Sequence, residues 1–405
     1  MATDPARATV PRIPRRGLLA LLAAASGAVV TACTGKSQPR PHASKNPASG
    51  PSAPPTAPAQ PGGTQSAATP VTVTTKGISG GLAELAHALY TGKQIDTTDA
   101  TAALHHRRPP KFARVTVTGS QGTWHGTPVG ILSQGHDLTF AVQQSGTWSV
   151  VAGWWPGLGV DAVMAGDKQF ALVIGSDARE SQGESVTSSR GDSLHIVGVD
   201  GSGGAGIVGI PRDSWTSFGK INSALVFHGP KGQVEAIKEI SGLPVKYYVL
   251  TGFDGFSSFV DTLGGVTVNS PQAIPSRGIP KGAAHLNSKV ALQFARERHA
   301  LPDGDFGRSA DQETLLVGFA LAIKAFGPSR FGKLVTTLSK LTDSNLPAEN
   351  ALQYAAWAWS MKPSQLVGKV AVGTNAVRGD QDVVLLGSQA KAIFKDFADG
   401  RLSHG

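Results

Sequence analysis

Two aspartates stand at the ends of apolar runs in the C-terminal part of the chain. Asp177 directly follows the run 168–176, and Asp192 directly precedes the run 193–199. Two such carboxylates at one sheet edge can share a hard cation such as Mg²⁺, whose ligands in proteins are oxygens. Without a cation or an arginine between them, the two charges would repel. The alternative is a pair of loop aspartates that only cap turns.

A set of arginines accompanies these aspartates. Planar guanidinium groups suit phosphate oxygens, so arginines combined with aspartates describe a pyrophosphate–metal site. Taken singly, each arginine is better explained as a surface ion pair, and only the set points to a site. Arg296 and Arg298 share a face only in extended chain, so a helix before them must end near Ala295. The set comprises Arg190, Arg212, Arg296, Arg298 and Arg308.

The elements that must position these side chains lie between about residues 166 and 400. Nearly continuous apolar strands at 168–176, 193–199 and 206–210 predict a sheet covered on both faces. Helical stretches between and after the strands predict a layered α/β domain. The predicted helices are 233–241, 256–263, 288–295, 312–325, 331–341, 348–361 and 388–398.

Residues 78–165 predict a smaller, mostly β accessory region. A short helix at 81–90 precedes strands at 113–119, 128–132, 137–143 and 147–152, separated by breaks at hairpin spacing. Four of the seven tryptophans of the chain lie here, at 124, 148, 154 and 155. Exposed tryptophans could stack on sugar rings, but we favour the interpretation that they fill the core of this region.

The N-terminus predicts export and a lipid anchor. Paired arginines at 15–16 precede the uncharged run 17–30, which has the length of a signal-peptide core, and Cys33 follows as the only cysteine. Residues 1–33 therefore resemble a lipoprotein signal in which Cys33 is lipidated, the alternative being an ordinary secretory signal. Residues 34–77 contain nine prolines and no acidic residue, which predicts a disordered tether. We expect the protein on the extracytoplasmic face of a bacterial membrane, anchored by lipid and reaching into the cell wall.

Charge and composition exclude several classes of function. The net charge is +9, but residues 78–405 hold 29 basic and 27 acidic side chains, so the folded part offers no broad face for nucleic acid. A single cysteine excludes a disulfide within the chain. The sequence contains no P-loop, no zinc-protease His-Glu-x-x-His and no Gly-x-Ser-x-Gly motif.

Seven motifs, in this order, resemble the LytR-CpsA-Psr family of cell-wall glycopolymer transferases. The resemblance runs from about 168 to 325 and implies a layered α-β-α domain with a central mixed sheet. It also implies Mg²⁺-dependent transfer of a glycan from a polyprenyl-pyrophosphate carrier to peptidoglycan. The motifs are 175–179 (GSDAR), 190–193 (RGDS), 210–213 (IPRD), 220–224 (KINSA), 253–266 (FDGFSSFVDTLGGV), 291–298 (ALQFARER) and 304–312 (GDFGRSADQ).

The resemblance implies a role for each site residue. Asp177 and Asp192 would be the Mg²⁺ ligands. The catalytic, pyrophosphate-binding set would be Arg190, Arg212, Arg296, Arg298, Arg308, Gln312 and Asp213. Supporting, substrate-binding positions would be Lys220, Asn222, Asp305, Phe253, Phe256 and Val260, the last three along an apolar slot for the prenyl tail.

The chain departs from the family pattern in two places. Asp311 stands where many members carry a second arginine, which changes the charge balance of the site. The family usually begins with a transmembrane helix, where this chain has the predicted lipid anchor and tether. Two alternative functions stay open: a polyprenyl-pyrophosphate phosphatase, and a non-catalytic lipoprotein that binds wall lipid or glycan.

Overall fold

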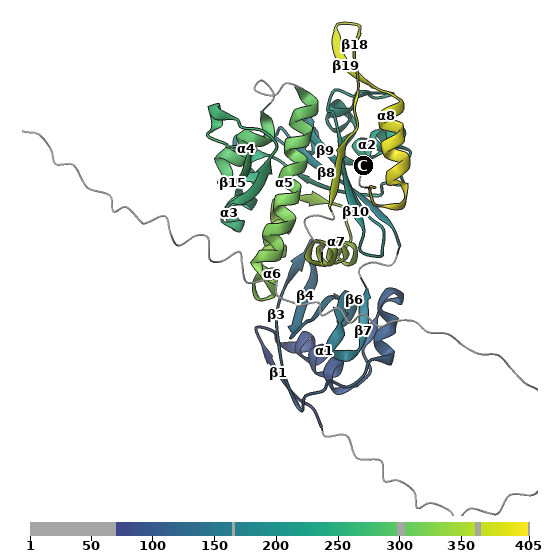
Figure 1. Ribbon diagram of the computed structural model, residues 1–405, viewed down its shortest axis with the longest axis vertical. Helices are drawn as coiled ribbons and strands as arrows, with labels where there is room; N and C mark the ends of the chain where they lie inside the picture. Colours follow the sequence, from purple (N-terminus) through teal and green to yellow (C-terminus); the bar gives the residue numbers. More distant parts are fainter. Residues whose placement is uncertain (1–69, 164–166, 298–303, 361–365, 404–405) are drawn as a thin grey trace, which may run out of the picture. The chain divides into compact units, whose positions relative to one another are not determined.

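The computed structural model describes residues 70–163, 167–297, 304–360 and 366–403, all of which belong to one compact unit, Ala67–Gly405. Two sheets dominate this unit, a seven-stranded one in the accessory region and a six-stranded one after it (Figure 1). The predicted lipoprotein signal, Cys33 and most of the predicted tether lie outside the described residues. Within the described ranges, no helix has the length and apolar character needed to cross a membrane.

The accessory sheet has the order β1-β3-β4-β5-β6-β2, with β7 on β6. Successive hairpins build its centre, and two-residue turns connect β3 to β4 and β5 to β6. Both residues of each turn have positive φ, at His125–Gly126 and Ser145–Gly146, as such hairpin turns require. The strands are β1 Thr72–Lys76, β2 Asp96–Thr97, β3 Arg114–Trp124, β4 Thr127–Gln134, β5 Asp137–Gln144, β6 Thr147–Trp155 and β7 Val160–Val163.

Strand β1 lies inside the segment whose composition indicated the tether. It pairs in parallel with β3, from Thr72 beside Arg114 to Lys76 beside Thr118. The alternating Thr-Val-Thr-Thr stretch therefore gains a ladder partner that composition alone does not reveal, and the folded region begins before residue 78. The predicted helix 81–90 is present as α1, Gly80–Thr91.

The six-stranded sheet is mixed, in the order β16-β13-β8-β9-β10-β17. Strands β8, β9 and β10 are consecutive antiparallel neighbours, whereas β13 joins β8 and β17 joins β10 in parallel. The three predicted apolar strands are thus confirmed, as is the layered α/β class. The strands are β8 Gln169–Ser176, β9 Gly191–Val199, β10 Ala205–Ile210, β13 Tyr247–Thr251, β16 Asp343–Ser344 and β17 Val367–Val370.

Among the described residues, three two-stranded sheets and seven further α-helices accompany the two large sheets. Helix α2 is broken at Gly229, whose φ of +66° is followed by Pro230. The small sheets pair β11 Trp215–Thr216 with β12 Gly219–Lys220, β14 Val266–Ser270 with β15 Gly282–Leu286, and β18 Gly373–Arg378 with β19 Gln381–Leu386. The helices are α2 Ala224–Ser241, α3 Phe253–Leu263, α4 Ser288–Arg296, α5 Asp305–Phe326, α6 Pro328–Leu341, α7 Ala348–Ser360 and α8 Ser388–Asp396.

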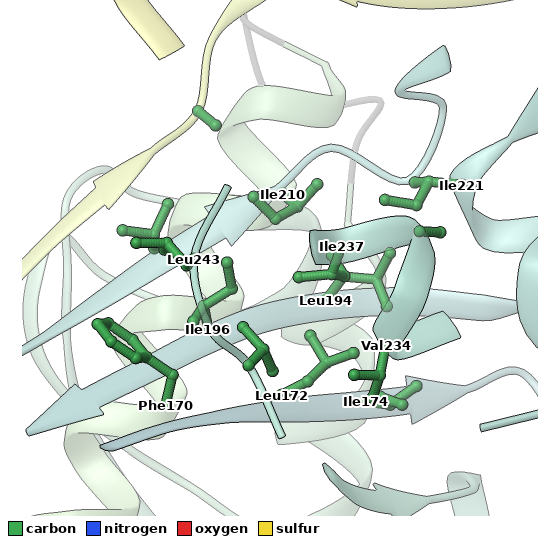
Figure 2. Close-up of a cluster of buried hydrophobic side chains, with 14 of the residues drawn as sticks. Phe170, Leu172, Ile174, Leu194, Ile196, Ile210, Ile221, Val234, Ile237 and Leu243 are labelled. Carbon is green, nitrogen blue, oxygen red and sulfur yellow. The ribbon is translucent and has the colours of Figure 1, made fainter. Parts of the chain in front are cut away.

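One face of the six-stranded sheet is a closed hydrophobic core. Leu172, Leu194 and Ile196 are fully buried, with Ile237 of α2 packed over them (Figure 2). Phe394 of α8 belongs to the same cluster. The other face meets α3, α5 and α7 and carries the site described next.

The accessory sheet is also covered on both faces. Trp148 and Trp155 are buried in the cluster that includes α1, whereas Trp124 is buried in a cluster with α6 and α7. Trp154 packs partly buried against that second cluster. The four tryptophans therefore contribute to the core, as the favoured interpretation predicts.

Candidate active site

The first two motifs meet at the end of strand β8. The backbone N–H of Asp177 donates to the carbonyl of Arg190 at 3.0 Å, and the N–H of Arg190 donates to Asp177 Oδ1 at 2.8 Å. Two guanidinium nitrogens of Arg190, Nε and Nη2, reach Asp177 Oδ2 at 3.0 and 2.9 Å. The register between β8 and β9 shifts at Gly175/Ser176, which turns this pair out of the ladder.

The second aspartate has a different arginine. Asp192, on β9, accepts from Arg212 Nη1 at 2.5 Å and from Asn222 Nδ2 at 3.3 Å. Arg212 Nε also lies 3.9 Å from Asp305 Oδ2, and Asp305 Oδ1 lies 2.9 Å from Arg308 Nη2. The result is a row of alternating charges from β9 through the end of β10 to the first turn of α5.

The surroundings of this row favour the charged form of Arg212 and disfavour that of Asp305. Burial opposes ionisation of Arg212, but Asp192, Asp213 and Asp305 more than offset it, so the pKa of Arg212 lies above its ordinary value. Burial raises the pKa of Asp305, with Arg308 acting in the opposite direction and Asp213 adding to the rise. Asp213 itself pairs with Lys220 Nζ at 3.3 Å.

Helix α5 begins seven residues, or about two turns, earlier than the pattern predicts. It starts at Asp305 rather than near Gln312, because an acidic side chain in the first turn interacts favourably with the helix dipole and Arg308 pairs with it one turn later. Asp305 and Arg308 are therefore helical residues rather than loop residues.

Arg296 is the last residue of α4, so the helix ends one residue after the predicted end at Ala295. Its guanidinium lies 4.7 Å from the centre of the Phe253 ring, and that of Arg179 lies 5.7 Å from the same ring. Gln312 Nε2 donates to the carbonyl of Ala295 at 2.9 Å and so ties α5 to the end of α4. Arg298 lies outside the described residues.

These charged groups stand at one part of a cavity of about 1030 Å³. Its polar lining comes chiefly from the residues just described, and most of the rest of its surface is apolar. Phe253 and Phe256 line it, whereas Val260 lies outside the lining and is fully buried in the adjoining core cluster. The charged and amide side chains in its wall are Asp177, Arg179, Arg190, Asp192, Arg212, Arg277, Gln293, Arg296, Arg308 and Gln312.

The donor set can be compared with the predicted magnesium site. Asp177 and Asp192 both line the cavity, and each carboxylate has further lone pairs beyond its contacts with arginine. Among the described residues, no group of three or more His, Cys, Asp or Glu side chains could hold a metal. Mg²⁺ takes oxygen ligands, so the two carboxylates fit part of a Mg²⁺ site whose remaining ligands would have to come from a bound molecule or water.

The comparisons with known proteins identify the family of this chain. The model of the LytR_cpsA_psr family matches residues 157–394, more than half of the chain. The chain belongs to this family. The matched residues run from the end of the accessory region through the whole six-stranded sheet to α8.

Curated relatives of this family member are named polyisoprenyl-teichoic acid–peptidoglycan teichoic acid transferase TagU. The protein from Bacillus mycoides is 32% identical over 186 residues, 43% of this chain and 59% of the relative. That from Bacillus subtilis is 31% identical over 194 residues, 45% of this chain and 62% of the relative. The chain thus spans about three fifths of the length of these two relatives. The crystal structure of B. subtilis TagU is 26% identical, covers 59% of this chain and 99% of its own, and has a TM-score of 0.46.

Most of the predicted site residues of this family member come together. Nine of them line the cavity, and Asn222, Asp213, Lys220 and Asp305 support that lining through the contacts given above. Val260 is the described residue that stands apart, because the helical spacing of α3 turns it toward β14 and β15. The nine are Asp177, Asp192, Arg190, Arg212, Phe253, Phe256, Arg296, Arg308 and Gln312.

Sequence reasoning missed two cationic side chains of the cavity. Arg179 was part of a motif but received no role, and its position over Phe253 was visible only in three dimensions. Arg277 Nε pairs with the buried carboxylate of Glu297 at 3.0 Å, and the surrounding Pro-Ser-Arg-Gly stretch carries no signal of such a role.

Proposed function

We propose that this protein is a phosphotransferase that moves a glycopolymer from a polyprenyl-pyrophosphate carrier onto peptidoglycan. The observation that carries the proposal is one cavity with an arginine–aspartate cluster at its polar part and an apolar interior. A polyprenyl pyrophosphate has the same division, with two phosphates joined to a long hydrocarbon. The names of the TagU relatives, which pair a polyisoprenyl-linked polymer with peptidoglycan, support the same substrate class.

The arginines bind and orient the two phosphates. Arg190 and Arg212 are each held by an aspartate, so their guanidinium planes are already fixed when the substrate arrives. Preorganised donors of this kind stabilise charge as it develops, which is the main source of catalysis in phosphoryl transfer. Arg296 and Arg308 add positive charge along the same wall.

Asp177 and Asp192 would hold Mg²⁺ together with oxygens of the substrate. When bound, the cation supplies Lewis-acid stabilisation to the phosphate oxygens. We call the polar part of the cavity, with Asp177, Arg190, Asp192 and Arg212, its mouth. Because both aspartates already pair with arginines, they also balance the positive charge of the mouth before the substrate binds.

The transfer itself exchanges one phosphorus–oxygen bond for another. A hydroxyl of the peptidoglycan acceptor attacks the phosphorus that is attached to the glycan, and its proton passes to a carboxylate at the mouth. The bond to the bridging oxygen breaks, and the departing polyprenyl phosphate keeps its electron pair. The glycan stays joined to the wall through a phosphodiester.

This function requires a position outside the cytoplasm, where peptidoglycan lies. We extend the proposal to a lipid anchor at Cys33 and to a tether that carries the folded unit into the wall. Labelling with a fatty-acid analogue in cells should tag the wild-type chain and leave Cys33→Ser untagged. Equal labelling of both would contradict the anchor without affecting the transferase proposal.

The full-length chain should be incubated in detergent with a polyprenyl-pyrophosphate-linked glycan and peptidoglycan oligomers. Mass spectrometry should detect glycan joined to the oligomer through phosphate, and the product should be lost on removal of Mg²⁺ and in Arg190→Ala. Phosphate release that does not depend on the acceptor would instead indicate a phosphatase. Tight binding of an unchanged substrate would indicate a carrier protein.

A further inference from the structure

The accessory sheet contributes to the wall of the lipid cavity. Trp124, at the end of β3, and Val129, on β4, both line the cavity and are only 7% and 0% exposed. We infer that the accessory sheet forms the closed end of this cavity and thereby sets the longest prenyl tail that the protein accepts. This inference rests on the proposed function, because it assigns a tail to the apolar interior.

The cavity extends far from the charged mouth. Its lining follows β8 from Asp177 back to Ala171, six residues or about 20 Å of strand. At that depth Ala171 lies beside Val197, which in turn lies beside Ile207, and all three line the cavity. The mouth and this inner row are thus at opposite ends of the same strands.

Beyond the inner row, the lining passes to α7 and the segment before it and reaches the accessory sheet. Leu346, Ala348 and Leu352 belong both to the lining and to the buried cluster that contains Trp124 and Val129. Every one of these side chains is less than 9% exposed, whereas the side chain of Arg190 at the mouth is 59% exposed. Among the described residues, a tail that enters at the mouth therefore meets a wall without an opening to solvent at this end.

The wall is also fixed in position. A Cβ atom on Gly122 of β3 would lie 2.1 Å from the carbonyl oxygen of Gly332 on α6, so strand and helix touch backbone to backbone. Gly332 N–H donates to Ser120 Oγ at 2.9 Å, and Thr123 N–H donates to Thr336 Oγ1 at 3.0 Å. Helix α6 itself lines the cavity, so the accessory sheet and this helix form one continuous wall.

The chemistry of the end wall suits hydrocarbon alone. The single polar atom of the Trp124 side chain, Nε1, donates to the carbonyl of Leu346 at 2.7 Å and is satisfied. The remaining side chains there are aliphatic or aromatic, so a polar group of a ligand would lose its hydrogen bonds to water without gaining a partner in the protein. Affinity should therefore rise with each added isoprene unit until the tail reaches Trp124, and then stop rising.

The test uses the full-length chain in detergent and a series of polyprenyl pyrophosphates of increasing length, each competing for binding with a fluorescent analogue. Wild type should show a length beyond which affinity no longer increases. Trp124→Leu should move this limit to longer tails, with affinity for them about tenfold above wild type. Val129→Phe fills the same end and should move the limit to shorter tails.

Trp148→Leu is the matched control. Trp148 belongs to the same sheet and is equally buried at 8%, but it packs in the cluster around α1 and lies outside the cavity lining. Its length limit should equal that of wild type. If Trp124→Leu and Val129→Phe fold, as judged by circular dichroism, and both keep the wild-type limit, the end wall lies elsewhere and this inference is wrong. If wild type binds no polyprenyl pyrophosphate of any length, the proposed function fails instead.

Discussion

The two faces of the six-stranded sheet are built from the same strands, but one face is a packed core and the other lines a cavity. On the face toward α2 and α8, Leu172, Ile174, Leu194 and Ile196 are all 0% exposed and pack without interruption. On the face toward α3, α5 and α7, the alternate positions of the same strands line the cavity, and they include Ala171, Gly175 and Ser193.

The difference lies in side-chain size at alternate positions. Successive residues of a strand point to opposite faces, so one strand can fill a core with large side chains and leave room with small ones. Strand β8 does this with Leu172 and Ile174 on one side and Ala171, Val173 and Gly175 on the other, where Val173 borders the cavity. A continuous apolar strand therefore need not mean that both of its faces are packed.

The largest effect is expected at the mouth of the open face, from Arg212→Ala. The change removes the cation that lies between Asp192 and Asp305, and the two carboxylates then repel the phosphates of the substrate. The rate of glycan transfer at saturating substrate should fall about 10²- to 10³-fold. Mass-spectrometric product formation over time measures it.

Arg330→Ala is the control for this change. Arg330 stacks on Phe326 and donates to its carbonyl, and it is exposed outside the cavity lining. Its removal should leave the transfer rate unchanged. A folded Arg212→Ala enzyme with wild-type turnover would mean that the charged mouth does not hold the phosphates.

The closed face should respond in stability rather than in binding. Leu172→Ala leaves a hole in a packed core, so the free energy of unfolding should fall by about 2–5 kcal/mol. Val173→Ala, one residue further on, trims a side chain that already borders the cavity and should cost less than about 1 kcal/mol. Urea denaturation of the two variants tests the contrast, and equal losses would contradict it.

Asp311 provides a pH-dependent test beneath the open face. Burial, and secondly the charge of Glu297, raise the pKa of Asp311 to about 7 from 3.8. Between these two values the folded protein keeps a proton that the unfolded chain has lost, so this group reduces stability as pH rises from about 4 to 7. Asp311→Asn should therefore gain about 2 kcal/mol over wild type between about pH 5 and pH 8.

Thermal denaturation of both proteins at several pH values measures this gain. Glu313, whose pKa burial also raises to about 7, is present in both, as is His195, whose pKa burial lowers to about 4. Only the difference between the two proteins therefore reports Asp311. A difference that stays constant across this range would show that Asp311 does not titrate there.

Much of the fold and of the site follows from sequence because it depends on local pattern. The strand at 168–176 is continuous and apolar, and Asp177 follows it, so the sheet and its polar edge are both predictable. Which arginine pairs with which aspartate is not predictable from the sequence. Arg190 pairs with Asp177, 13 residues away, and Arg212 with Asp192, 20 residues away, because the strands between them are antiparallel.

The cavity is the part that sequence could not provide. Whether a small residue such as Ala171 meets a neighbour or an open space depends on the distance of α3, α5 and α7, which no strand pattern encodes. The contact of Gly122 with Gly332 links residues 210 positions apart, and each glycine is unremarkable in its own segment. The role of the accessory sheet was therefore open until the structure placed Trp124 and Val129 in the cavity wall.

The smallest effects are expected from alanine-to-leucine substitutions on the two sides of the sheet. They compare the two faces most directly, because the added carbon is the same on both. Ala171→Leu adds carbon to the open cavity, so the free energy of unfolding should stay within about 1 kcal/mol of wild type while affinity for a long polyprenyl pyrophosphate falls about tenfold. Ala236→Leu, on α2, adds the same carbon to the packed core and should cost about 1–3 kcal/mol with unchanged affinity. If Ala171→Leu destabilised the protein and spared binding, the cavity face would be packed like the other one, and the tail would have to lie outside it.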